Sequence, residues 1–97
     1  MRTYITMFRN VELECFTTPQ FIDIEPEKAA EQLARSIKMA AKDNPKQLLN
    51  YRHLKLCYFG EFDDTTGKMD LLETPEEILD CAALVKATGI FEEKKDA

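Results

Sequence analysis

The sequence predicts one α+β domain, in which an antiparallel sheet of about four strands packs with two helices in the order β-β-α-β-β-α. Three observations carry this prediction: residues 3–15 and 54–62 have the patterns of extended segments, apolar residues repeat at helical spacing between residues 30 and 41, and proline or glycine separates the segments. A chain of 97 residues can build one hydrophobic core. We expect residues 1–90 to form this domain and residues 91–97 to be a flexible tail of acidic and basic residues.

The first two predicted strands form a hairpin. Residues 3–8 favour extended structure, and apolar residues alternate with glutamates over residues 11–15. Arg9-Asn10 is short enough to join the strands, since Asn tolerates the positive φ of tight turns. Pro19 breaks the second strand, and a loop is expected to follow as far as Ile24.

The first predicted helix begins at Pro26, because proline suits the first helical position. An apolar stripe follows at three-to-four spacing, formed by Ala30, Leu33, Ile37 and Ala41. Asn44 ends the helix, since the residue before a proline is pushed out of the α region. Both helices are expected on one face of the sheet.

The third and fourth predicted strands form a second hairpin. Residues 54–62 are extended and apolar on parts of both faces, which predicts a central strand and favours a homodimer through the face that the helices leave open. Gly67 closes the loop, and residues 68–72 return as a strand.

The second helix is predicted from residue 75. Thr74, Pro75 and Glu77 form a capping-box pattern with proline at the first helical position. Apolar residues between 78 and 85 supply its buried face, and Gly89 is a suitable stop.

Residue types that carry catalysis or hold cofactors are sparse. His53 is the only histidine, and there is no glycine-rich phosphate loop. We therefore predict that the protein is not an enzyme, has no catalytic residues and uses no cofactor.

Metal binding is also not expected. A zinc site from Cys15, His53, Cys57 and Cys81 would lack the closely spaced ligand pairs of structural zinc sites, so free thiols are predicted. A metal-dependent nuclease using Glu61, Asp63 and Asp70 is a weaker alternative, because strand spacing alone does not make these ligands converge.

Charge is segregated along the chain, although the net charge is only −5. Residues 28–55 hold seven basic and two acidic residues, and residues 56–97 hold four basic and eleven acidic ones. Such segregation is typical either of a surface for a polar partner or of ordinary solvated helix faces. No long apolar run and no signal-peptide pattern appear, so we expect neither export nor membrane insertion, and a cytoplasmic location.

Cations flank two aromatic residues in the first predicted strand. Tyr4 and Phe8 lie between Arg2 and Arg9, an arrangement with which proteins stack bases and contact phosphates of single strands. Strand aromatics are also common in cores, and the net acidity opposes strong nonspecific DNA affinity. The candidate phosphate contacts are Arg2, Arg9, Lys38, Lys42, Lys46, Arg52 and Lys55.

Two segments carry a resemblance to a known family. The segments Phe16-Thr17-Thr18-Pro19-Gln20-Phe21 and Leu56 to Gly67, followed by Pro75, resemble the small nonstructural protein of gokushoviruses, single-stranded DNA phages of the Microviridae. Two departures are Cys57-Tyr58-Phe59, where the family usually reads Tyr-x-Ile, and a basic lead-in at residues 52–55 that is typically acidic.

The resemblance implies a non-capsid protein of the infected bacterial cytoplasm. Its implied role is to bind single-stranded DNA and to assist viral DNA replication, or the switch to single-strand synthesis and genome packaging. The alternative is an adaptor that docks on a phage or host replication protein without contacting DNA, using acidic residues such as Asp63-Asp64 and Glu76-Glu77.

Overall fold

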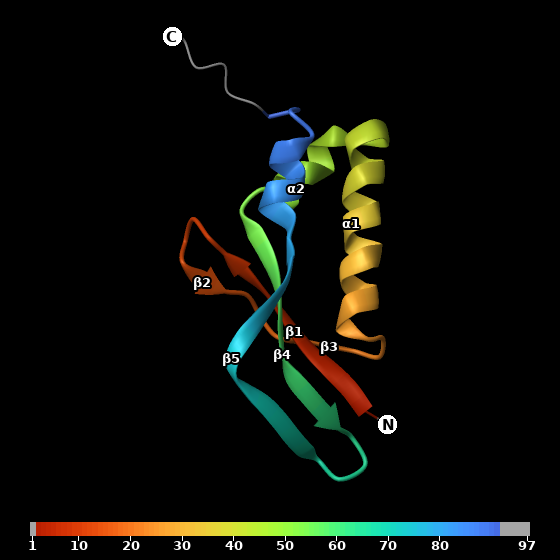
Figure 1. Ribbon diagram of the computed structural model, residues 1–97, viewed down its shortest axis with the longest axis vertical. Coiled ribbons are helices and arrows are strands. Elements are labelled where there is room, and N and C mark those ends of the chain that lie inside the picture. The colour runs from red at the N-terminus through yellow and green to blue at the C-terminus, as the bar shows by residue number, and fades with distance from the viewer. Residues whose placement is uncertain (1, 92–97) are drawn as a thin grey trace.

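A computed structural model describes residues 2–91, which form one antiparallel sheet with two α-helices and a 3-10 helix (Figure 1). The elements are β1 (Arg2–Asn10), β2 (Cys15–Phe16), β3 (Gln20–Ile22), α1 (Pro26–Asp43), η1 (Pro45–Asn50), β4 (Leu54–Asp63), β5 (Lys68–Asp80) and α2 (Cys81–Ala87). The strand order is β2-β1-β4-β5, and β3 pairs with β1 beside β2. The predicted α+β class with an antiparallel sheet is confirmed. Of the predicted tail, residues 92–97 lie outside the described residues, whereas Phe91 is described and packs against buried residues of the core.

The first hairpin differs from the prediction. β1 runs through Arg9 and Asn10, and residues 11–14 form the turn instead of a strand. The side chain of Asn10 explains the difference, because its Oδ1 accepts hydrogen bonds from the backbone N–H groups of Glu12 and Leu13 at 3.0 and 2.9 Å. Glu14 then takes a left-handed conformation, with φ of 54°. The predicted loop to residue 24 also contains a strand, β3.

Helix α1 begins and ends where the sequence predicts. Pro26 occupies its first turn, and the backbone N–H of Asn44 donates to the carbonyl of Ala40 at 2.9 Å, which closes its last turn. The buried residues Ala30, Ile37 and Ala40 lie along one stripe of the helix.

The predicted start of the second helix at residue 75 is wrong. Residues 74–77 belong to β5, which continues to Asp80, so the capping-box pattern at Thr74 does not start a helix. The segment 72–75 has no register partner, because Gly60 pairs with Leu71 and Tyr58 pairs with Glu76. Pro75 therefore lies where no ladder hydrogen bond is needed, and a strand can pass through it.

Helix α2 begins instead after Asp80. The Asp80 carboxylate accepts a hydrogen bond from the backbone N–H of Ala83 at 2.9 Å, which is the geometry of a side-chain N-cap. The helix is short and ends before Gly89, which has a φ of 70°.

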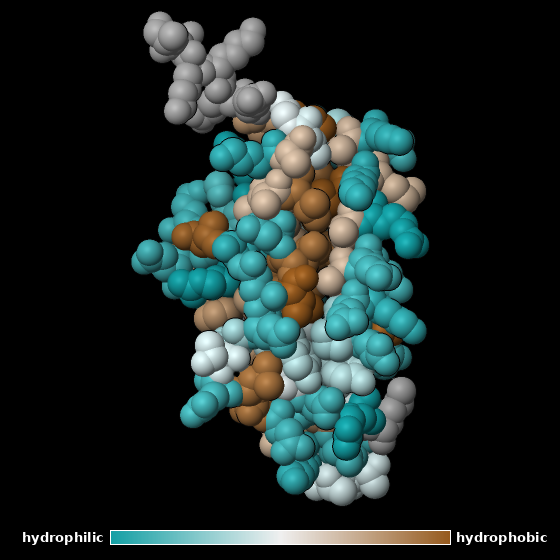
Figure 2. Space-filling model, in the orientation of Figure 1, coloured by the Kyte–Doolittle hydropathy of each residue, from teal (hydrophilic) through white to brown (hydrophobic). Residues whose placement is uncertain are grey.

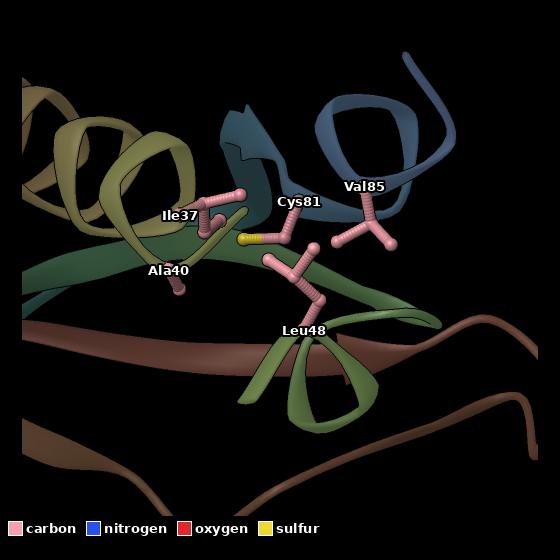
Figure 3. Packing of buried hydrophobic residues seen from close by; sticks show 5 residues of the cluster. All are labelled: Ile37, Ala40, Leu48, Cys81 and Val85. Carbon is pink, nitrogen blue, oxygen red and sulfur yellow. The ribbon is translucent and has the colours of Figure 1, made fainter. Parts of the chain in front are cut away.

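The core joins all three helices on one face of the sheet. Ile37 and Ala40 of α1 meet Leu48 of η1 and Cys81 and Val85 of α2 (Figure 3). Phe8, Leu54 and Leu79 pack against this cluster from β1, β4 and β5. The expectation that both α-helices lie on one face is therefore correct.

Candidate nucleic-acid interface

The strand register sorts the residues of β1 and β4 onto two faces. Phe8 pairs with Leu56 on the face that the helices cover. Met7 pairs with Cys57 and Thr3 with Phe62, so these residues lie on the opposite face. All helices of residues 2–91 meet in the core cluster on the first face, so none of them covers the second.

Two phenylalanine pairs lie on this second face. The rings of Phe16 and Phe59 are 5.2 Å apart and nearly perpendicular, and the rings of Phe21 and Phe62 are 5.6 Å apart at 68°. Edge-to-face contacts of this kind hold each ring in a fixed orientation. We call the surface formed by Phe16, Phe21, Phe59 and Phe62 the phenylalanine face.

The outer strands β2 and β3 bring half of these rings to the site. Phe16 is the register partner of Arg9, and Phe21 is the register partner of Ile5. Ile5 beneath this surface is only 4% exposed, whereas Phe16 is 40% and Phe21 is 51% exposed. The phenylalanine face therefore has a buried side chain, Ile5, beneath aromatic rings that are exposed to solvent.

A bulge places Phe59 in this surface. Ile5 pairs with Gly60 and Thr6 with Tyr58, so Phe59 is an extra residue in β4. Gly60 has a φ of 144°, and a Cβ atom there would collide with the backbone of Asp70 and Leu71 in β5. Only glycine fits this close approach, which explains the glycine in a strand otherwise rich in large side chains.

Two cations border the phenylalanine face. The Arg9 guanidinium lies 5.0 Å from the centre of the Phe16 ring, which is a cation–π contact. Lys55, the register partner of Arg9, forms ion pairs with Glu77 at 2.9 Å and Asp80 at 3.8 Å. The hydrogen bond to Glu77 is the main cause that raises the pKa of Lys55. Arg9 forms no ion pair within residues 2–91, so it is the cation of this pair that can meet a phosphate.

The surface continues onto β5 as an apolar area. Met69 pairs with Phe62 and Leu71 pairs with Gly60, so both lie on the same side as the phenylalanine rings. Met69 is 50% and Leu71 61% exposed. Contiguous exposed apolar surface of this kind marks a binding site more often than an ordinary solvated surface.

The residues predicted from the sequence as stacking groups lie on the other face. Phe8 packs against the core cluster and contacts Tyr51 at 6.4 Å between ring centres. Tyr4 shares the face of Phe8 and lies 6.3 Å from Tyr58. The aromatic residues on the uncovered face are thus not the ones that the sequence predicted as stacking groups.

The predicted phosphate contacts are spread over the molecule. Arg2 forms an ion pair with Glu61 at 3.3 Å, and Arg52 lies over the ring of Phe91 at 5.8 Å. Lys38 and Lys42 are exposed on α1, and Lys46 is exposed on η1. Of the predicted cations, Arg9 and Lys55 border the phenylalanine face.

The residues of the two alternative metal sites, the zinc site and the nuclease site, are either far apart or held by other interactions. Cys57 lies on the uncovered face and Cys81 in the core cluster on the other, and burial raises the pKa of both thiols, that of Cys81 to about 11. Asp63 accepts a hydrogen bond from the backbone N–H of Thr65 at 2.9 Å, the main cause that lowers the pKa of its carboxyl. Among residues 2–91, no three His, Cys, Asp or Glu side chains are grouped to hold a metal ion.

No helix in the described part of the chain is long and apolar enough to cross a membrane. Comparison with protein-family models, with curated proteins and with solved structures gives no match to this chain.

Proposed function

We propose that this protein is a non-enzymatic binding protein that holds single-stranded DNA on the phenylalanine face. The observation that carries the proposal is the pair of phenylalanine contacts, Phe16 with Phe59 and Phe21 with Phe62, on the sheet face without helices, next to Arg9. Every base has a π-face, so aromatic side chains on an uncovered sheet hold single strands with little sequence preference.

The chemistry of the surface fits unpaired bases better than a duplex. Stacked bases need fixed rings and apolar surroundings, which the phenylalanine pairs and the buried Ile5 supply. A duplex offers chiefly phosphates, and a chain with net charge −5 is poorly suited to neutralising many of them. We therefore expect affinity to come mostly from stacking and only partly from Arg9.

The resemblance to the gokushovirus small nonstructural protein supports a proposal for the biological setting. All four phenylalanines lie inside the two segments that carry that resemblance, residues 16–21 and 56–67. We propose that the protein acts in the cytoplasm of an infected bacterium, where it assists viral DNA replication or the switch to single-strand synthesis and genome packaging.

Fluorescence anisotropy with labelled oligothymidine and a matching duplex tests this function. We expect the single strand to bind more tightly, with a shallow salt dependence of about −0.7 in log–log slope for each phosphate contacted. Phe21→Ala should weaken binding by roughly tenfold, since loss of one stacked base costs about 1–3 kcal/mol. Arg9→Gln should weaken it and flatten the salt dependence.

Leu49→Ala is the matched control, because Leu49 is 52% exposed, close to the 51% of Phe21, but lies on η1. It should leave the affinity unchanged. The absence of binding at low salt, or equal losses from Phe21→Ala and Leu49→Ala, would refute the assignment of DNA to this face.

A second candidate function is a protein-docking adaptor. Met69 and Leu71 favour it, because they extend the same face with exposed apolar side chains. In that case the unaltered protein should capture a phage or host replication protein and should not bind oligothymidine. Leu71→Glu should abolish the capture.

A further inference from the structure

A groove lies on the helix-bearing side of the molecule, between α1 and β5, and its walls hold both apolar residues and four glutamates, Glu27, Glu31, Glu76 and Glu77. Ala30 and Ala34 of α1 face Ile78 and Leu79 of β5 across a space of about 450 Å³. Figure 2 shows hydrophobic surface running between α1 and the side formed by β5 and α2. Alanine side chains on the helix wall leave room for another chain to approach closely.

The helix flank beside the groove carries both signs of charge. Glu27 and Glu31 line the groove in the N-terminal half of α1. Lys38 follows Glu31 by seven residues and Lys42 by eleven, so helical geometry puts these lysines on the same flank in the C-terminal half. All four side chains are exposed, and none forms an ion pair within residues 2–91.

Such a flank is complementary to itself. When two copies of α1 run antiparallel about a two-fold axis between Ala34 and Arg35, Glu31 of each copy faces Lys38 of the other, and Glu27 faces Lys42. A two-fold interface requires that one surface match itself in this way. Opposite charges along the flank favour this antiparallel order over the parallel one, which would place like charges together.

We propose that the occupant of the groove is a second copy of this chain, which packs its α1 antiparallel against the first. The aliphatic stems of the incoming Lys38 and Lys42 cover Ile78, while their amino groups reach the glutamates. Stable interfaces bury roughly 1,200–2,000 Å² in total. Ile78 and Leu79 of β5 therefore add contact area to the interface, which the two helices alone would not provide.

This interface differs from the homodimer that the sequence predicts. That prediction used the uncovered face of the sheet, whereas the groove lies on the side of the helices. The proposal does not rest on DNA binding, because the phenylalanine face stays accessible in the dimer.

Two charge-reversal variants test the interface by sedimentation velocity. Glu27→Lys with Glu31→Lys makes the flank basic throughout, and Lys38→Glu with Lys42→Glu makes it acidic throughout. We expect the unaltered protein to be a dimer at micromolar concentration and each variant alone to dissociate at least tenfold more readily. An equimolar mixture of the two variants should form a heterodimer.

Ala34→Glu is an independent variant that keeps the helix charges in place. It sets two carboxylates close to each other beside the axis, so it should also separate the copies. Met69→Glu, on the uncovered face, should leave the dimer intact. A monomeric unaltered protein, charge-reversed variants that remain dimeric, or a mixture that stays monomeric would each overturn the proposal, and circular dichroism of each variant establishes that it is folded.

Discussion

Gly60 is the residue on which the local shape of the candidate site depends. It follows the bulge residue Phe59 and lies against the backbone of β5, where a side chain would collide with Asp70. Its φ of 144° is also a conformation that other residues rarely adopt.

Gly60→Ala should therefore lower the free energy of unfolding by at least about 2–3 kcal/mol, measured by urea denaturation. Gly67→Ala is the control, since Gly67 also has positive φ, at 75°, but a Cβ atom there would meet nothing within 4 Å. That substitution should cost about 1 kcal/mol, the strain of the left-handed conformation alone. Equal losses would mean that the contact with β5 does not constrain Gly60.

The three thiols are distinguished by burial. Cys15 is exposed, whereas Cys57 is 5% and Cys81 0% exposed. A thiol reagent should therefore modify one cysteine rapidly in the folded protein and the other two only after unfolding. Cys15→Ser should remove the fast reaction, and rapid modification of all three thiols would contradict the described core.

Cys81 also makes stability depend on alkaline pH. Burial raises its pKa to about 11, while the ordinary value in the unfolded chain is 9.0. The unfolded thiol ionises first, so its contribution to stability is complete below about pH 9 and is lost as the pH rises toward 11. The full loss approaches roughly 2–3 kcal/mol. Urea denaturation between pH 8 and pH 11 should therefore show a steeper fall in the free energy of unfolding for the unaltered protein than for Cys81→Ala, which has no thiol at this position.

At the scale of elements, Asp80 and Thr74 are competing candidates for the cap of the last helix. Asp80→Ala should lower the free energy of unfolding by about 1 kcal/mol, because it removes the hydrogen bond to the N–H of Ala83. Thr74→Ala should change it by less than about 0.5 kcal/mol, as at most exposed positions. The reverse order in urea denaturation would restore the helix start predicted from the sequence.

Local sequence signals predicted some elements and misled on others. Pro26 and the Asn44-Pro45 pair mark the ends of α1 correctly, since both act through their own backbone geometry. The equally strong pattern at Thr74 failed, because the strand pairing with β4 resumes at Glu76 and carries β5 onward to Asp80. Such long-range pairing leaves no trace in a window of a few residues.

At the scale of the whole molecule, the candidate site depends on register. Alternation in the sequence separates Phe8 from its neighbours, but it does not say which face the helices cover. The bulge at Phe59 then reverses the alternation of β4 in the middle of the strand, so Phe59 joins Phe62 on one face although their spacing is odd. The sequence therefore predicted a strand with two apolar faces, but the stacking residues predicted from it, Tyr4 and Phe8, lie on the face that the helices cover.

The most direct test of the phenylalanine face uses tryptophan as a reporter, because the chain contains none. Phe21→Trp places an indole on that face, and Leu49→Trp places one with matched exposure on η1. Oligothymidine is added to each variant while tryptophan fluorescence is recorded. Stacking predicts strong quenching of the first and no change in the second. Quenching of the Leu49→Trp variant alone, or of neither, would contradict the proposal that this face holds single-stranded DNA.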